Sequence, residues 1–88
     1  AELPEETLER SELREVLEAT MERLPEEQRM TLFLVDRLGL SYEETADTME
    51  TELGTVKSRL YRARAKMRDY LQENMELLPP RYRLKGEE

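Results

Sequence analysis

The sequence contains no cysteine and no histidine, and only three glycines. Without cysteine the chain has no disulfide, no thiolate metal site and no cysteine nucleophile. Without histidine it also lacks the commonest general base and the commonest metal ligand. Its longest apolar run, residues 32–35, is far shorter than the roughly 20 residues that a membrane-spanning helix needs. These absences disfavour a metalloenzyme, a secreted disulfide scaffold and a membrane protein, and we expect no metal and no cofactor.

With 88 residues, the chain is long enough for one domain with a modest core. Charged residues make up 40% of it and hydrophobic residues 38%. The apolar residues recur at regular intervals, so this charge-rich composition indicates a folded domain and not a disordered chain. The first residues carry no secretory signal pattern, so we do not expect export.

The formal net charge of −7 is unevenly distributed along the chain. Residues 1–53 hold sixteen acids and five bases, and residues 69–88 hold five acids and three bases. Residues 55–68 instead hold six bases and no acid. A basic stripe in an acidic protein is a local docking point for a polyanion, and the acidic remainder helps to orient the approach. The alternative is a solvated helix face, which is what most charge runs are.

Apolar residues at intervals of three and four predict four helices and no strand, which is an all-α fold. The first helix begins near Pro4 or Ser11 and places an apolar stripe inward over residues 13–24. The second helix spans about 25–38, with a proline at its first position and Gly39 as its stop signal. Its expected inward side chains are Met30, Phe33, Leu34 and Leu38.

The third and fourth helices are separated by a tight connection at residues 50–52. Ser41 and Glu44 have the spacing of a capping box, so the third helix starts directly after Ser41. The fourth helix spans about 53–75 and ends before the Pro79-Pro80 pair. The expected inward side chains of the third helix are Tyr42, Thr45, Ala46 and Met49. Those of the fourth are Val56, Leu60, Ala63, Met67 and either Tyr70 or Leu71.

A short helix, a turn of about three residues and a longer basic helix have the spacing of a helix-turn-helix motif. The inward stripe of the fourth helix determines which side chains face away from the core. We expect four to point most directly outward: Ser58, Tyr61, Arg62 and Ala65. Four others flank them: Thr55, Lys57, Arg59 and Arg68. Arginine and lysine bind guanine edges in the major groove, and serine and tyrosine bind bases or phosphates.

An ordinary amphipathic helix with a basic outer face is the competing explanation. Such a helix in so charge-rich a protein would normally mix glutamate with its lysines and arginines, as the first helix does. Fourteen consecutive residues without an acid, in a chain with twenty-one acids, weigh against it. The charge pattern and the helix spacing together favour DNA binding.

Three stretches of this sequence resemble region 4 of bacterial sigma-70 family factors, most closely those of the extracytoplasmic-function (ECF) group. They are Leu-Pro-Glu-Glu-Gln-Arg at 24–29, Gly-Leu-Ser-Tyr-Glu-Glu-Thr-Ala at 39–46, and Gly-Thr-Val-Lys-Ser-Arg-Leu-Tyr-Arg-Ala-Arg at 54–64. They stand in the family's order and spacing, and the resemblance covers about residues 11–71. The resemblance implies a small bundle of four helices with a C-terminal helix-turn-helix and no wing.

The same resemblance implies a cytoplasmic, nucleoid-associated, monomeric domain that binds the promoter −35 element and docks on the β flap of core RNA polymerase. An anti-sigma factor is a possible further partner. Four positions match those with which the family reads bases: Lys57, Ser58, Tyr61 and Arg62. Five match its phosphate-binding positions: Ser41, Tyr42, Thr55, Arg59 and Arg64. Capping and core packing explain Ser41 and Tyr42 equally well.

The sequence departs from the family pattern at several positions. Glu50 lies where the turn commonly carries glycine, and a left-handed backbone there would cost a non-glycine residue on the order of 1 kcal/mol. Glu52 places a negative charge at the start of the fourth helix, where serine or proline is common. Thr45 and Thr48 replace larger aliphatic residues, which predicts a looser core.

The resemblance divides the chain into three parts. Residues 1–10 are a linker or a helix extension, residues 11–76 form the region 4-like domain, and residues 77–88 form a tail. The tail looks extended from Pro79 onward, and side chains available for packing near it are Leu77, Leu78, Tyr82 and Leu84. A complete ECF factor also needs a promoter-melting domain, so we expect either part of a longer protein or a truncated paralogue.

Two other classes of function remain for comparison. A protein-interaction module would bind polymerase or an anti-sigma factor through the acidic first and second helices, with weak or no DNA binding. An enzyme is disfavoured because the adjacent glutamate pairs at 5–6, 26–27 and 43–44 point about 100° apart on a helix. They fit capping and helix-dipole roles better than acid–base catalysis.

Overall fold

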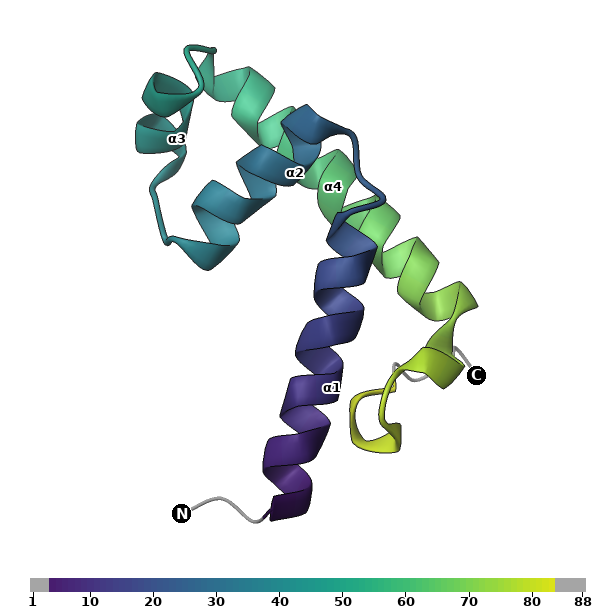
Figure 1. Ribbon diagram of the computed structural model, residues 1–88. Helices are drawn as coiled ribbons and strands as arrows, with labels where there is room; N and C mark the ends of the chain where they lie inside the picture. Colours follow the sequence, from purple (N-terminus) through teal and green to yellow (C-terminus); the bar gives the residue numbers. More distant parts are fainter. Residues whose placement is uncertain (1–3, 84–88) are drawn as a thin grey trace.

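The computed structural model describes residues 4–83, and these residues contain helices and no strand (Figure 1). The predicted all-α bundle with four helices is therefore confirmed. The four α-helices are α1 (Pro4–Met21), α2 (Glu26–Leu32), α3 (Tyr42–Thr48) and α4 (Leu53–Glu73). A π-helical turn, η1 (Phe33–Arg37), continues α2, and two short 3-10 turns follow α4: η2 (Met75–Leu77) and η3 (Pro80–Tyr82).

The core forms along one side of α4, against which α1, α2 and α3 all pack. Val56 and Ala63 have no exposed surface and Leu60 has 2%, so the predicted inward stripe of α4 is confirmed. The other buried members of this cluster are Leu24, Leu32 and Ala46, with Met21, Val35, Tyr42 and Met67 packed around them. Burying these apolar side chains is the main favourable term in the stability of so small a domain.

Three threonines are buried beside these apolar residues: Thr20, Thr31 and Thr45. Each hydroxyl donates a hydrogen bond of 2.7–2.8 Å to the carbonyl oxygen four residues earlier in the chain. The polar atom is thereby satisfied within its own helix, so the methyl group packs inward without an unpaired hydroxyl. Thr45 thus stands in the core, as expected. Thr48 does not: it is exposed, and its hydroxyl donates to the carbonyl of Glu44 (2.8 Å), so the expectation that it loosens the core is wrong.

The inward face of α2 differs from the predicted one. Leu34 is buried as expected, but Met30 is 44% exposed and Leu38 is 57% exposed. Thr31 and Leu32 are buried instead. Two features caused the error: α2 is apolar on two sides, and the π-helical turn changes the phase of the residues after Leu32.

Two left-handed residues end the second and third helical segments. Gly39 has φ +74° after the π-helical turn, and Glu50 has φ +53° after α3. The amide of Thr51 donates to the carbonyl of Ala46 (2.9 Å), and the amide of Glu50 donates to that of Asp47 (3.2 Å). This is a Schellman motif, which places Glu50 at the position where glycine is usual. The strain expected at Glu50 is therefore present.

Residues 74–83 are not extended but fold back beside the N-terminal half of α1 (Figure 1). Leu78 is 3% exposed, whereas Leu77 is 48% exposed. The guanidinium of Arg81 lies 3.6 Å from Glu6 and 3.4 Å from Glu9 on α1. This segment therefore connects the end of α4 with the start of α1; Leu84, another candidate for packing, lies outside the described residues.

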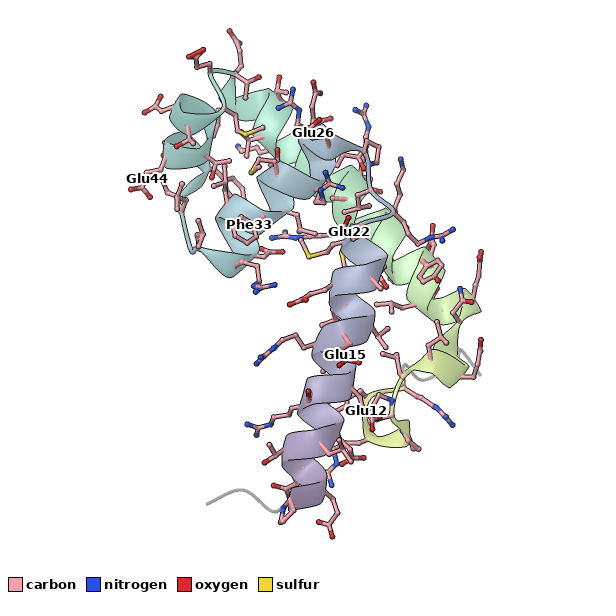
Figure 2. All side chains as sticks on the ribbon, in the orientation of Figure 1. Glu12, Glu15, Glu22, Glu26, Phe33 and Glu44 are labelled. Atoms are coloured by element: carbon pink, nitrogen blue, oxygen red, sulfur yellow. The ribbon has the colours of Figure 1, made fainter. Side chains whose placement is uncertain are left out.

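Figure 2 shows the labelled glutamates of α1, α2, α3 and the turn after α1 on the outside of the molecule. Within residues 4–83, no helix is both long enough and apolar enough to cross a membrane.

We predict that Glu50→Gly stabilises the protein by about 0.5–1 kcal/mol, because the relief of left-handed strain exceeds the entropy cost of a glycine. Thermal unfolding should show an increase of about 5 °C in Tm. Glu50→Ala is the matched control, since it removes the same charge but keeps the Cβ atom. An equal gain in the alanine variant would show that charge, and not backbone strain, is responsible.

Candidate nucleic-acid interface

α3 and α4 are joined by the Schellman turn, which gives the helix-turn-helix arrangement expected from the sequence (Figure 1). Ala46 of α3 packs in the same cluster as Val56 and Leu60 of α4. This contact fixes the rotation of α4 about its own axis. The outer side of α4 is consequently determined by the core.

The outer side of the N-terminal half of α4 carries three of the four predicted base-reading residues as exposed side chains. They are Lys57, Tyr61 and Arg62, and Tyr61 is 76% exposed. Among residues 4–83, no ion pair involves Lys57 or Arg62. Both charges are therefore directed to solvent and available to an external anion.

The fourth predicted base-reading residue, Ser58, is half-buried, and so is Ala65. Both were expected to point directly outward. Short side chains on a helix are partly covered by longer neighbours three and four residues away. Ser58 therefore lies on the same face as Tyr61 and Arg62 but closer to the helix axis.

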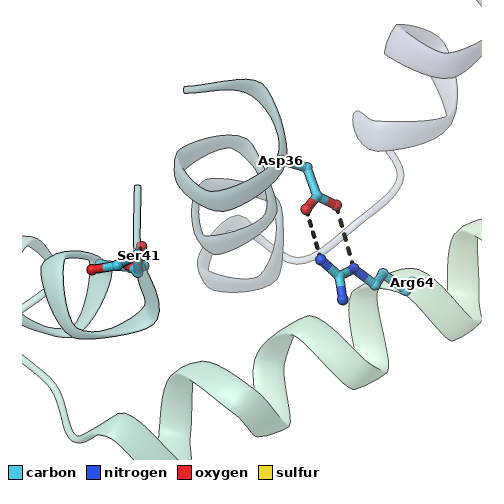
Figure 3. Close-up of polar contacts among 4 residues, drawn as sticks. Asp36, Ser41 and Arg64 are labelled. Atoms are coloured by element: carbon cyan, nitrogen blue, oxygen red, sulfur yellow. Dashed lines mark hydrogen bonds and ion pairs between the residues drawn. The ribbon is translucent and has the colours of Figure 1, made fainter. Parts of the chain in front are cut away.

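Arg59 and Arg64, two of the predicted phosphate-binding residues, are held by acids of the α2–η1 segment. The Arg59 guanidinium lies 3.1 Å from Glu27, and its side chain is only 19% exposed. Arg64 binds both carboxylate oxygens of Asp36, with distances of 2.6 Å from Nη2 and 3.3 Å from Nε (Figure 3). The hydrogen bond to Asp36 raises the pKa of Arg64 above its ordinary value. The pairing of these two arginines was not foreseen from the sequence.

Ser41 caps α3 in the predicted capping box. Its hydroxyl oxygen accepts from the amide of Glu44 (2.9 Å), and the Glu44 carboxylate accepts from the amide of Ser41 (2.8 Å). The backbone hydrogen bond from Ser41, followed by that involving its side chain, lowers the pKa of Glu44. Ser41 is exposed, and the capping box uses its hydroxyl oxygen only as an acceptor, so the hydroxyl can still donate a hydrogen bond to an anion.

Tyr42 and Thr55 are both half-buried. Tyr42 packs against the core cluster, so the expected core-packing role is confirmed, and its phosphate-binding role stays a prediction. Thr55 lies in the first turn of α4, where no acidic residue stands. Amides at a helix N-terminus attract anions, although Glu52 at the N-cap adds a negative charge and makes no side-chain capping hydrogen bond.

A second surface, which the sequence did not predict, lies between α1 and α4. It is a groove of about 780 Å³. We call it the α1–α4 groove; its walls are Leu13, Leu17, Met21, Leu32, Met67 and Leu71. Its polar lining consists of Arg10, Arg14, Arg37, Arg64 and Arg68 with Glu18 and Asp36. The groove is therefore apolar at its base and carries a positive balance, in a chain whose net charge is −7.

The described part of the chain offers no group of three acidic side chains placed to hold a metal ion. It has two surfaces of another kind: the exposed basic side of α4, and the α1–α4 groove, which is lined by apolar side chains and arginines. Both are surfaces for binding macromolecules.

The sequence matches the family model of sigma-70, region 4, over residues 14–67, which is more than half of the chain. The protein therefore belongs to the sigma-70 region 4 family, as its resemblance indicated. It is similar to the ECF RNA polymerase sigma factor SigE of Mycolicibacterium smegmatis, with 46% identity over 68 residues. It is also similar to the ECF RNA polymerase sigma-E factor of Escherichia coli and to that of Salmonella typhimurium, each with 48% identity over 61 residues.

These matches cover 77% of this chain and 26% of the mycobacterial protein, and 69% of this chain and 32% of the enterobacterial proteins. The chain thus spans about a quarter to a third of the length of these relatives. The residues matched by the family model, 14–67, include α3 and most of α4.

We predict that Ser41→Ala destabilises the protein by about 1 kcal/mol, because α3 loses its N-cap. The same change should raise the pKa of Glu44 only part of the way toward its ordinary value, because the hydroxyl is lost while the backbone amide of residue 41 still donates to the carboxylate. NMR of the Glu44 carboxyl carbon follows this shift. A carboxylate with a lowered pKa contributes stability above its unfolded pKa, and this contribution is lost as the pH falls through the folded pKa. The variant should therefore lose less stability than the native protein below about pH 4.5.

Ser58→Ala is the control, because Ser58 lies on α4 and takes no part in the capping box. It should leave the Glu44 titration unchanged. An unchanged titration in Ser41→Ala would show that the Ser41 hydroxyl does not contribute to the lowered pKa of Glu44.

Proposed function

We propose that the chain is the promoter-binding domain of an ECF-type RNA polymerase sigma factor and that α4 reads the −35 element. One observation carries this proposal: Lys57 and Arg62, which form no ion pair within residues 4–83, flank exposed Tyr61 on the second helix of a helix-turn-helix. The proposed domain acts in the cytoplasm as a monomer, with no cofactor and no catalytic activity.

Electrostatics supplies the first step of the proposed mechanism. The six bases of residues 55–68 attract the phosphate backbone, while the acidic helices α1 and α3 repel it. The DNA therefore approaches α4 and not the rest of the surface. Phosphate contacts from Ser41, Tyr42, Thr55 and the two paired arginines then fix the position of the duplex without reading its sequence.

Side chains of the N-terminal half of α4 supply the second step. Arg62 and Lys57 are suited to guanine O6 and N7, because each presents N–H donors from an exposed side chain. Tyr61 offers both an apolar ring and a hydroxyl, and Ser58 offers a short hydroxyl beside it. Half-buried Ala65 allows the helix to approach the base edges closely.

The test is a binding selection from a random duplex library at low salt, comparing the native chain with Lys57→Ala/Arg62→Ala. The native protein should enrich one motif, and the double variant should bind that motif about 30-fold more weakly or worse, because each base contact is worth about 1–3 kcal/mol. Arg14→Ala/Arg37→Ala removes the same charge from α1 and η1 and should keep the motif. Selective binding that survives the loss of Lys57 and Arg62 would contradict the assignment.

The α1–α4 groove favours a second function, the binding of core RNA polymerase. An apolar groove with a positive rim fits an amphipathic helix that carries acidic residues at its edges. We propose the β flap of the polymerase as the occupant during initiation, with an anti-sigma factor as a competitor for this domain. This function does not require intrinsic DNA binding, so it also covers a domain that binds promoters only within the polymerase complex.

We predict that Arg14→Glu weakens the association of the chain with purified core polymerase by about tenfold, since an attraction is replaced by a repulsion of similar size. Arg14 is exposed and forms no ion pair within residues 4–83, so folding should be unaffected. Arg62→Glu, with the same charge change on α4, should leave polymerase binding intact and abolish DNA binding. A loss of polymerase binding in Arg62→Glu but not in Arg14→Glu would exclude the groove as the docking surface.

A further inference from the structure

The six basic side chains of α4 fall into two groups. Arg59 and Arg64 are bound by carboxylates from the α2–η1 segment. The other four make no ion pair within residues 4–83: Lys57, Arg62, Lys66 and Arg68. The two paired arginines lie on opposite edges of the inward stripe, so α2 and η1 hold α4 from both sides.

The two ion pairs differ in geometry. Arg64 and Asp36 form two hydrogen bonds, and both side chains are about half exposed. Such a two-bond contact is directional and fixes both groups (Figure 3). Arg59 meets Glu27 through one contact of 3.1 Å, and the Glu27 side chain is 73% exposed. The Glu27 carboxylate can therefore rotate into solvent without disturbing any packed group.

Glu27 loses little when it leaves Arg59. It lies in the first turn of α2, where the positive end of the helix dipole stabilises a carboxylate whether or not an arginine is present. Arg59, in contrast, keeps the stem of its side chain against the protein, since only 19% of it is exposed. Only the guanidinium needs a new partner.

Phosphate and carboxylate present the same kind of acceptor to a guanidinium. We propose that Glu27 competes with DNA: it holds Arg59 in the free protein and releases it to a backbone phosphate in the complex. The inference rests on the proposed DNA binding. It assigns to Glu27, a residue outside the helix-turn-helix, the role of lowering the affinity of the domain for any duplex.

The exchange lowers the affinity of the domain for DNA. Each encounter with DNA must break the Glu27–Arg59 pair before Arg59 contributes, so the gain from this phosphate contact is reduced by the strength of the pair. Solvent reaches the pair from the side of Glu27, whose side chain is 73% exposed, so the pair is weak, the reduction is small and the exchange is fast and reversible. A domain with this device binds non-specific DNA less tightly, while the base contacts of Lys57 and Arg62 remain unaffected.

Glu27→Gln tests the exchange, with Glu26→Gln as the matched control. Glu26 is the neighbouring exposed glutamate of the same helical turn, and it pairs with no arginine within residues 4–83. Binding to a random-sequence duplex at low salt is measured by fluorescence anisotropy. We expect Glu27→Gln to bind about threefold more tightly than Glu26→Gln, which is the size of one exposed ion pair. In an Arg59→Gln background the two variants should bind equally.

NMR of the Arg59 Nε–H group provides a second readout. In the free protein its resonance should differ between the native chain and Glu27→Gln. In the DNA complex the two resonances should coincide, because Glu27 no longer contacts Arg59. A difference that persists in the complex would show that the ion pair remains closed and would overturn the exchange.

The outcomes separate this inference from the proposed function. If the native chain binds duplex and the two glutamine variants bind equally, the exchange is wrong and the DNA-binding function stands. If the advantage of Glu27→Gln persists without Arg59, the effect is general charge repulsion and the exchange is again wrong. If no variant binds DNA, the proposed function fails and the exchange fails with it.

Discussion

The apolar stripe of α4 is the constraint on which the rest of the structure depends. Val56, Leu60 and Ala63 are the most completely buried part of the core, and the other three helices each pack against α4. Because this one helix provides both the centre of the core and the exposed basic surface, its rotation cannot change without exposing apolar side chains. The positions of Lys57, Tyr61 and Arg62 are thus set by hydrophobic burial on the opposite side of the same helix.

Charge has two separate roles around α4. Arg59 and Arg64 help to hold the fold together, because they pair with Glu27 and Asp36 where α2 and η1 cross α4. Lys57 and Arg62 have no such partner within the described residues and contribute their full charge to the outer field. The net charge of −7 does not reveal this difference among the arginines and lysines of α4. Residues 55–68 hold six bases and no acid, so the local potential over α4 is positive. The local arrangement therefore says more about binding than the total does.

Local signals predicted the helix-turn-helix well. The capping box at Ser41 and Glu44, the left-handed position at Glu50 and the stripe of α4 are each determined by a few neighbouring residues, so they are readable from sequence. Leu38 was misplaced because a π-helical turn changes the helical phase after Leu32, and no local residue type announces such a turn. Met30 precedes this turn and was misplaced because α2 has apolar residues on two sides.

Contacts between residues far apart in the sequence were also not predicted. Asp36 and Arg64 are 28 residues apart, and their contact depends on the crossing of η1 with α4. The packing of Leu78 and the ion pairs of Arg81 with α1 depend in the same way on the return of residues 74–83. The α1–α4 groove likewise exists only once two helices are placed. The spacing of apolar residues along the chain predicts which face of each helix is buried. It does not predict which other helix that face contacts.

The two proposed binding surfaces are not independent, because Arg64 and Arg68 line both the α1–α4 groove and the hollow between α3 and α4 beside Lys57 and Tyr61. A partner that brings acidic groups to the groove lowers the positive potential that DNA meets on the other side of these arginines. Salt screens charges over a Debye length of about 8 Å, so the effect is greatest at the two arginines that both surfaces share. A partner that makes only apolar contacts in the groove does not lower this positive potential. A partner that assists DNA binding should therefore rely on the leucines and methionines of the groove, and one that blocks DNA binding should rely on its arginines.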